Sequence, residues 1–277
     1  MNDLVSIIVP CFNQAQYLDD ALQSVLEQSY EYWECIIVND GSQDTTEDVA
    51  KKWIEKDLRF KYLEKENGGL SSARNYGINF ARGTYILPLD ADDKISSNYV
   101  EICINEFAND IDLKVVYGKA IKFGKISKEW KLPSYNFKKL LLGNMIFCTA
   151  MYKKEDWQNT SGYDENMKLG FEDWEFWINI LKDSGKVKRN LAGTFYYRIH
   201  DNNSMTSILN NDKVKKIILR KYIFDKHKLL YTTKTDYDLY VENNNLNDKL
   251  FNLHKHISVK TLFLSILKRI KFKLSTI

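Results

Sequence analysis

Three aspartates end an apolar segment in the stretch "TYILPLDADDK", residues 84–94. Asp90 and Asp92 stand two positions apart, so on an extended chain their side chains point to the same side. Two carboxylates held together repel each other unless a proton or a cation lies between them. Mg²⁺ and Mn²⁺ accept oxygen ligands, and Mg²⁺ commonly keeps substrate phosphates in its shell. The spacing therefore indicates a divalent metal site for a phosphorylated ligand. Aspartates after a strand are also common as turn residues or helix N-caps, which is the default interpretation of this motif when it is taken alone.

A second acidic pair, Glu172 and Asp173, precedes a segment in which Phe176, Ile180 and Leu181 continue a helical pattern. A carboxylate in such a position could act as a general base that takes a proton from a hydroxyl. Acids also favour the positive N-terminal end of a helix without any catalytic role. For an isolated acidic pair, stabilisation of the helix terminus is the default interpretation.

The elements that must position these acids can be read from the first hundred residues. The apolar runs "VSIIVP", "ECIIVND" and "YILPLD" are typical of strands buried on both faces of a parallel sheet. Helical spacing and a short strand pattern, "FKYLEKE", lie between them. This order predicts a doubly wound α/β fold with right-handed crossovers and a mostly parallel sheet.

In such sheets, ligands bind outside the carboxyl ends of the strands. The sequence places polar groups there, in "PCFN", "NDGS" and "DADD". No strand is followed by a glycine-rich phosphate-binding motif. A metal held by the acids could supply the missing counter-charge for a nucleotide's phosphates.

The second half of the chain extends the same sheet, and Lys-rich helical sequence begins near residue 210. At residues 259–274, seven apolar side chains share one helical arc, with Lys260, Lys268 and Lys271 mostly on the other side. This pattern predicts a basic amphipathic helix that lies on an anionic membrane surface or packs against protein. We weigh the two outcomes equally.

The composition excludes several classes of protein. A formal charge of +3 is too small to indicate nucleic-acid binding, and a hydrophobic fraction of 44% argues against wholesale disorder. The four cysteines form no CxxC pair, which favours free thiols in a reducing compartment. No secretory signal or membrane-spanning run is present, so we expect a cytoplasmic protein, with attachment to the inner membrane face left open.

Five segments occur in an order that resembles the family 2 glycosyltransferases, which are inverting enzymes with the GT-A fold. They are "VSIIVPCFNQAQYL", "IIVNDGSQDTT", "NGGLSSARNYGINFARGTYILPLDADD", "GYDENMKLGFEDWEFW" and "YYRIHDNNSMT". The resemblance covers roughly the first two hundred residues and implies a catalytic domain over 1–209. Within it, residues 1–98 would bind the nucleotide sugar and residues 99–209 the acceptor, followed by a helical extension over 210–277.

The resemblance also implies roles for individual residues. Asp40 would hold the base of the donor, Arg74 would lie near the nucleotide, and Asp90 would lie near the ribose. Asp92 and His200 would bind a divalent metal, Mn²⁺ or Mg²⁺.

The resemblance also implies which residues contact the acceptor hydroxyl and which others contact the nucleotide-sugar donor. Asp173 would be the general base, with Glu172 as a ligand of the acceptor hydroxyl or the alternative base. The other residues expected at the donor are Pro10, Phe12, Asn13, Ala91, Gly170 and Phe171. Of the three acids after the strand, Asp93 is left as a turn or helix-start residue.

The expected reaction is inverting transfer from a nucleotide sugar, most commonly UDP-linked in this family, to a hydroxyl of a glycan or lipid-linked acceptor in cell-surface polysaccharide synthesis. No nucleic-acid partner is expected, and an oligomer is compatible with the sequence. A phosphatase of the haloacid dehalogenase kind fits poorly, because its motif would need Thr or Val where Lys94 stands. The open alternative is a non-catalytic protein that keeps the fold and binds sugar nucleotides or a membrane surface.

Overall fold

The computed structural model describes residues 3–200 and 212–231. Its first half is the predicted alternation of strands and helices. The elements are β1 (Val5–Cys11), α1 (Ala15–Leu26), β2 (Trp33–Asn39), α2 (Thr46–Lys56), β3 (Phe60–Glu64), α3 (Leu70–Phe80) and β4 (Tyr85–Pro88).

The second half mixes short and long elements. They are β5 (Lys94–Ile95), α4 (Tyr99–Asn109), β6 (Leu113–Gly124), β7 (Lys128–Trp130), α5 (Phe137–Leu140), β8 (Met151–Lys153), α6 (Lys154–Gln158), α7 (Glu172–Leu181), β9 (Lys186–Ile199), α9 (Lys213–Lys226) and a 3₁₀ turn, η1 (Lys228–Leu230).

The nine strands in the described part of the chain form one sheet, in the order β3-β2-β1-β4-β8-β6-β9-β5, with β7 paired to β6. Strands β3, β2, β1 and β4 run parallel to one another, whereas β8 is antiparallel to both β4 and β6. Strands β6 and β9 are again parallel. The predicted doubly wound, mostly parallel α/β fold is confirmed, and β8 joins the strands of the second half to the same sheet.

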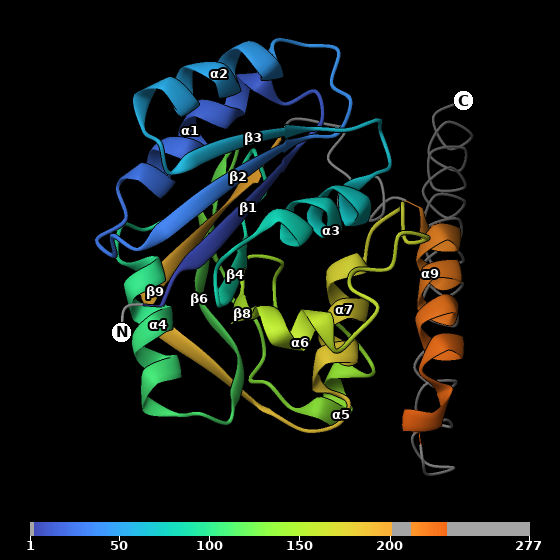
Figure 1. Cartoon of the computed structure of the whole chain (residues 1–277). Coiled ribbons are helices and arrows are strands. Elements are labelled where there is room, and N and C mark those ends of the chain that lie inside the picture. The colour runs from blue at the N-terminus through green and yellow to red at the C-terminus, as the bar shows by residue number, and fades with distance from the viewer. Residues whose placement is uncertain (1–2, 201–211, 232–277) are drawn as a thin grey trace, which may run out of the picture. The chain divides into compact units, whose positions relative to one another are not determined.

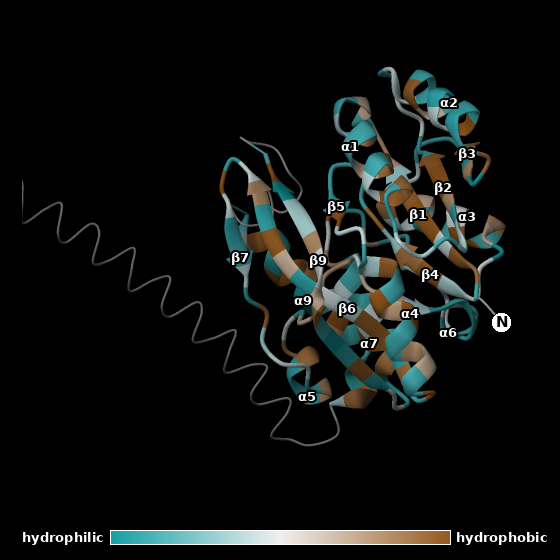
Figure 2. Cartoon of the chain, turned by 90° about the vertical axis from the view of Figure 1, so that its left-hand side faces the viewer, coloured by the Kyte–Doolittle hydropathy of each residue, from teal (hydrophilic) through white to brown (hydrophobic). Residues whose placement is uncertain are grey.

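Helices α1 and α2 cover one face of the first strands and α3 covers the other (Figure 1). This double cover explains the apolar sequences of β1 and β2, which are buried along their whole length and coloured largely hydrophobic in Figure 2. Helix α3 approaches the sheet closely at Gly77, where a Cβ would lie 2.7 Å from Ile8 and 2.8 Å from Val38. The close approach fixes the height at which α3 presents its side chains.

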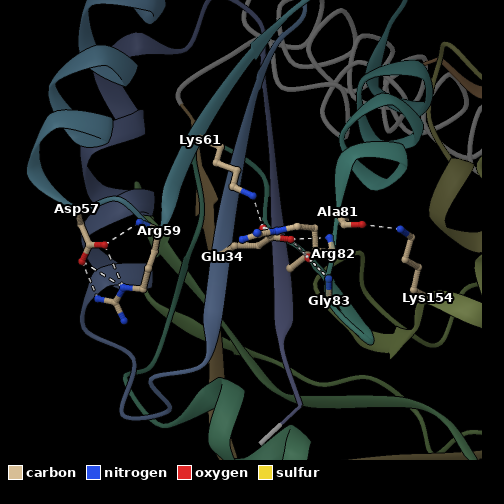
Figure 3. Close-up of polar contacts among 9 residues, drawn as sticks. Glu34, Asp57, Arg59, Lys61, Ala81, Arg82, Gly83 and Lys154 are labelled. Carbon is tan, nitrogen blue, oxygen red and sulfur yellow. Dashed lines mark hydrogen bonds and ion pairs between the residues drawn. The ribbon is translucent and has the colours of Figure 1, made fainter.

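The amino ends of the strands are held by one buried carboxylate, Glu34 of β2 (Figure 3). It accepts hydrogen bonds from the Ser6 hydroxyl at 2.7 Å and the Arg82 backbone N–H at 2.6 Å, and it pairs with Lys61. Burial alone would raise the pKa of Glu34, but these donors outweigh it and lower the pKa to about 2. The contact ties β1, β2, β3 and the α3–β4 turn together at the end away from the predicted site.

Helix α9 contacts the preceding α/β part of the chain through Tyr222 and Arg220. The Tyr222 hydroxyl donates to Asp164 at 2.9 Å, and the Arg220 guanidinium lies 5.6 Å from the ring centre of Trp174. A compact unit extends to Asp225, and the predicted boundary at residue 209 stays a prediction. The predicted amphipathic segment 259–274 lies outside the described residues. None of the helices in the described ranges is long and apolar enough to cross a membrane.

Candidate active site

The carboxyl ends of β1, β2 and β4 lie side by side, as the sequence predicts. Backbone hydrogen bonds extend the sheet beyond the strands, from Asp40 N–H to the Cys11 carbonyl and from Leu89 N–H to the Ile8 carbonyl, both 2.9 Å. Asp40 and Asp90 therefore stand on one rim of the sheet, each directly after a central strand.

The Asp40 carboxylate is buried and bound on both oxygens. Oδ1 accepts from Lys65 Nζ at 2.8 Å and from the Gly68 N–H at 3.0 Å, and Oδ2 accepts from the Gly69 N–H at 2.8 Å. Asp40 thus holds the loop that leads into α3.

A second set of contacts connects the loops that follow β1 and β2. Asn13 has a left-handed backbone with φ of 53°. Its N–H donates to the Ser42 hydroxyl at 3.0 Å, and its side-chain oxygen accepts from the Gln43 N–H at 2.8 Å. Pro10 is buried within β1, whereas Phe12 is 48% exposed beside these loops. The ring of Phe12 is therefore accessible to a ligand on this rim.

Arg74 of α3 brings the two acidic motifs together. Its side chain is fully buried, and its guanidinium donates to Asp90 at 2.7 Å and to Glu172 at 2.8 Å. Burial would lower the pKa of Arg74, but the two carboxylates raise it well above the usual value. A permanent cation thus separates two acids that lie far apart in the sequence.

The segment after β4 is a turn, which corrects the extended geometry expected for Asp90 and Asp92. The Asp93 N–H donates to the Asp90 carbonyl at 3.0 Å. The two side chains therefore have different partners. Asp90 accepts from Arg74, whereas Asp92 lies 2.6 Å from His200 Nε2. The other ring nitrogen of His200 lies 3.3 Å from the Tyr17 hydroxyl. Burial and Asp90 raise the pKa of Asp92, and His200 opposes that shift.

Asp93 does form part of a turn, as expected, but its side chain is also buried at the site, with 1% exposure. Oδ1 accepts from the Arg198 N–H at 2.8 Å, whereas Oδ2 has no hydrogen-bond partner within the described residues. One carboxylate oxygen of Asp90, one of Asp93 and the sulfur of Cys148, each a possible metal ligand, lie within 4.8 Å of one another. Burial, together with Asp92 and Asp90, raises the pKa of Asp93 well above its usual value.

These observations test whether the residues present suit the predicted metal. An orphaned, buried carboxylate oxygen beside two further acids is a position that a divalent cation would satisfy. Carboxylate and imidazole groups are ligands that Mn²⁺ accepts, and carboxylates suit Mg²⁺. The residues at this turn therefore fit the implied metal.

Asp173 lies in the first turn of α7, after two residues with left-handed backbones, Gly170 and Phe171 (φ of 111° and 65°). Its Oδ1 accepts from the Trp174 N–H at 2.7 Å, and its Oδ2 accepts from the Asn144 side-chain amide at 2.8 Å. Burial and the neighbouring Glu172 raise the pKa of Asp173 to about 7, although nearby Arg74 opposes them. A carboxylate that titrates near neutrality is suited to general-base catalysis at physiological pH.

The structure joins Arg74, Asp90 and Glu172 in one contact network and Asp92 with His200 in another. The catalytic, donor and metal roles of these residues stay predictions. Sequence reasoning missed Asn144, which stands in the apolar stretch "GNMIFCTAMY" without any motif. It also missed Cys148, whose thiol lies 3.5 Å from Asp90.

Comparisons with known proteins show the family to which the chain belongs. A family model described as Glycosyl transferase family 2 matches residues 6–174, more than half of the chain. The chain is 34% identical over 218 residues to chondroitin synthase of Pasteurella multocida, covering 77% of this chain and 22% of that protein. It is 30% identical over 210 residues to the minor teichoic acid biosynthesis protein GgaB of Bacillus subtilis, covering 72% and 23%. The chain thus spans about a quarter of the length of these two relatives.

Solved structures show the same fold. TarS 1–349 of S. aureus in complex with UDP-GlcNAc matches with a TM-score of 0.61 at 19% identity, over 73% of this chain and 60% of that one. The mannosyltransferase PcManGT of Pyrobaculum calidifontis, in complex with GDP-Man and Mn²⁺, matches with a TM-score of 0.59 at 14% identity, over 89% and 81%. At these identities the likeness concerns the fold alone.

Proposed function

The chain belongs to glycosyl transferase family 2 and has the GT-A fold, and on this basis we propose that it transfers a sugar, with inversion, from a nucleotide donor to an acceptor hydroxyl. The observation that carries the proposal is the Arg74 contact with both Asp90 and Glu172. It holds the acid expected at the donor next to the pair that contains the expected base. With the acid expected at the donor and the expected base on the same rim of the sheet, a sugar could pass directly from a bound donor to a bound acceptor.

The donor is proposed to be UDP-linked and the product a bacterial cell-surface polysaccharide. Support comes from the relatives, whose names refer to chondroitin and teichoic acid synthesis. Further support comes from the structural neighbour that holds UDP-GlcNAc. The acceptor is proposed to be a glycan or a lipid-linked glycan.

In the proposed reaction, the acceptor oxygen bonds to the anomeric carbon while the bond from that carbon to the phosphate oxygen breaks. The electron pair of the broken bond leaves with the nucleoside diphosphate. The acceptor's proton passes to the Asp173 carboxylate, on the face opposite the leaving group. The Arg74 guanidinium donates to both Asp90 and Glu172 and so offsets the repulsion between the two acids.

A divalent metal would be held by Asp92 and His200, with the free oxygen of Asp93 close to the same turn. When bound, it would stabilise the negative charge of the departing diphosphate. Asp40 and Arg74 would order the loop and the helix around the nucleotide.

Two variants test the proposal. Asp173→Asn is expected to reduce transfer by about 10²- to 10⁴-fold while UDP binding stays within about twofold, because the base contributes to the chemical step alone. Asp92→Asn is expected to weaken the thermal stabilisation by UDP and Mn²⁺. Transfer is measured as release of UDP from a panel of UDP-sugars with mixed glycan acceptors, and binding by the shift in Tm.

The matched control is Asp183→Asn, an exposed acid just beyond the other end of α7, which should leave both measurements unchanged. Wild-type transfer rates in Asp173→Asn would show that the base is wrongly assigned. If no nucleotide or nucleotide sugar stabilised the wild-type protein, the proposed function itself would be wrong.

A further inference from the structure

The end of α5 and the segment that follows it hold the start of α7 at two points. The Asn144 side-chain amide donates to Asp173 Oδ2 at 2.8 Å, and the indole N–H of Trp174 donates to the Leu140 carbonyl at 2.6 Å. Leu140 is fully buried and Trp174 nearly so. Both contacts reach the one turn of α7 that carries the proposed base.

The orientation of the Asn144 amide is set by a second bond. Its side-chain oxygen accepts from the Ile146 N–H at 3.1 Å, which only an oxygen can do, so the NH₂ group faces Asp173. On the other side, Asp173 Oδ1 accepts from the Trp174 N–H at 2.7 Å. Each carboxylate oxygen thus holds one donor, which stops the group from rotating and leaves a further acceptor position on each oxygen.

We propose that Asn144 is the positioning residue for the general base. It holds the Asp173 carboxylate in one orientation, in which the remaining lone pairs of the carboxylate can receive the proton of the hydroxyl that accepts the sugar. The inference rests on the proposed function, because that function makes Asp173 the general base. The contact between Asn144 and Asp173 does not depend on it. Asn144 acts through Asp173 and needs no contact with the sugar.

The charged and titratable groups around Asp173 come from α7 itself and from two other places in the fold. Glu172 precedes it in α7, Arg74 faces it from α3, and the Cys148 thiol lies in the segment after Asn144. Besides these groups, the Asn144 side-chain amide and the Trp174 backbone N–H donate hydrogen bonds to Asp173 and favour its ionised form. Loss of the Asn144 amide would therefore make the carboxyl harder to ionise as well as freer to turn.

The test uses variants of the full chain. Asn144→Leu keeps the approximate size of the side chain and removes its donor, whereas Asn144→Asp keeps the shape and places a second acid against Asp173. For Asn144→Leu, we expect kcat to fall about ten- to hundredfold through lost orientation. The acid limb of the pH–rate profile should rise by about one pH unit, as expected for a lost hydrogen bond to a charged group. Asn144→Asp should shift the limb at least as far, and the KM for the donor should stay within twofold.

The matched control is Asn136→Ala, which removes the cap of α5 in the same segment, where the Asn136 side chain accepts from the Lys139 N–H. It should lower stability slightly and leave the pH profile unchanged. If Asn144→Leu lowered kcat with the acid limb at its wild-type position, Asn144 would be a stabilising residue only, and the inference would be overturned.

A readout without turnover separates this inference from the proposed function. The Asp173 carboxyl can be titrated by ¹³C NMR in wild type and in both Asn144 variants, with Asp173→Asn to assign its signal. A higher pKa in the variants supports the inference even if no sugar transfer is found in the wild type. An unchanged pKa would overturn it even in an active transferase.

Discussion

Asp173 is a half-buried carboxyl whose surroundings disfavour its charge. Its folded pKa of about 7 lies above the ordinary value of 3.8, first because of burial and then because of Glu172. The folded state therefore holds a proton that the unfolded state releases between about pH 4 and pH 7. Stability should fall as the pH rises through that window, and the cost of the buried charge is complete above pH 7.

Asp173→Asn should consequently stabilise the protein while it abolishes the proposed activity. We expect a gain of about 1–3 kcal/mol at pH 8 and almost none near pH 4, because asparagine carries no charge at either pH. Urea unfolding of the metal-free protein at both pH values measures the difference. A variant that is less stable than wild type at pH 8 would show that the ionised carboxylate is well accommodated.

At the scale of elements, helix α3 connects the packing of the sheet with the geometry of the site. It lies against β1 and β2 at Gly77 and carries Arg74 to Asp90 and Glu172. A shift of this helix by a fraction of an ångström would move the guanidinium relative to both acids. The height of α3 over the sheet is therefore a structural requirement of the site.

Gly77→Ala tests that requirement. Alanine is the better helix former by about 1 kcal/mol, but its Cβ would lie under 3 Å from two branched side chains, Ile8 and Val38. We expect overpacking to outweigh propensity, with a net loss of about 1–3 kcal/mol and reduced transfer. Gly143→Ala is the control, since nothing lies within 4 Å of a Cβ there, and should change stability by less than about 0.5 kcal/mol. Equal stabilities in urea unfolding would contradict the prediction.

Glu34 makes a separate prediction for the opposite end of the sheet (Figure 3). Its folded pKa of about 2 lies below the ordinary 4.5, so its contribution is complete above pH 4.5 and is lost as the pH falls to 2. Lys61 and Arg82 are partly exposed, so we expect Glu34→Gln to cost only about 1–3 kcal/mol at pH 7 and much less at pH 3. Asp57→Asn, in a more exposed pair with Arg59, should cost less than about 1 kcal/mol. A loss independent of pH would exclude the ion pair as the cause.

The elements also show which features could be read from the sequence. Continuous apolar runs are distinctive because strands covered on both faces need them, and acids placed after those runs could be located on the sheet's rim. A turn at Asp93 is expected, but the spacing does not predict that Asp90 and Asp92 lie in the same turn and contact different partners. The Asn144–Asp173 contact crosses a segment without periodicity, so nothing in the sequence indicates it.

At the scale of the whole molecule, the proposed reaction requires the chain to reach its acceptor. A lipid-linked acceptor would lie at a membrane, and the described part of the chain contains no membrane-spanning helix. The segment 259–274, outside the described residues, is predicted from its sequence to be a basic amphipathic helix. Such a helix would bring the catalytic domain to an anionic surface without crossing it.

The prediction is that the full chain binds vesicles that contain anionic lipid and that binding weakens at high salt. Each lysine near such a surface contributes about 1 kcal/mol, so changing Lys260, Lys268 and Lys271 to Glu should reduce binding at least about tenfold. The control changes three exposed lysines elsewhere, Lys51, Lys131 and Lys188, to Glu and should bind nearly as wild type does. Vesicle sedimentation measures the bound fraction, and UDP release from a soluble glycan acceptor checks that the site is intact. If the tail variant and the control sedimented equally well, the segment would pack against protein instead, and another surface would have to recruit the enzyme.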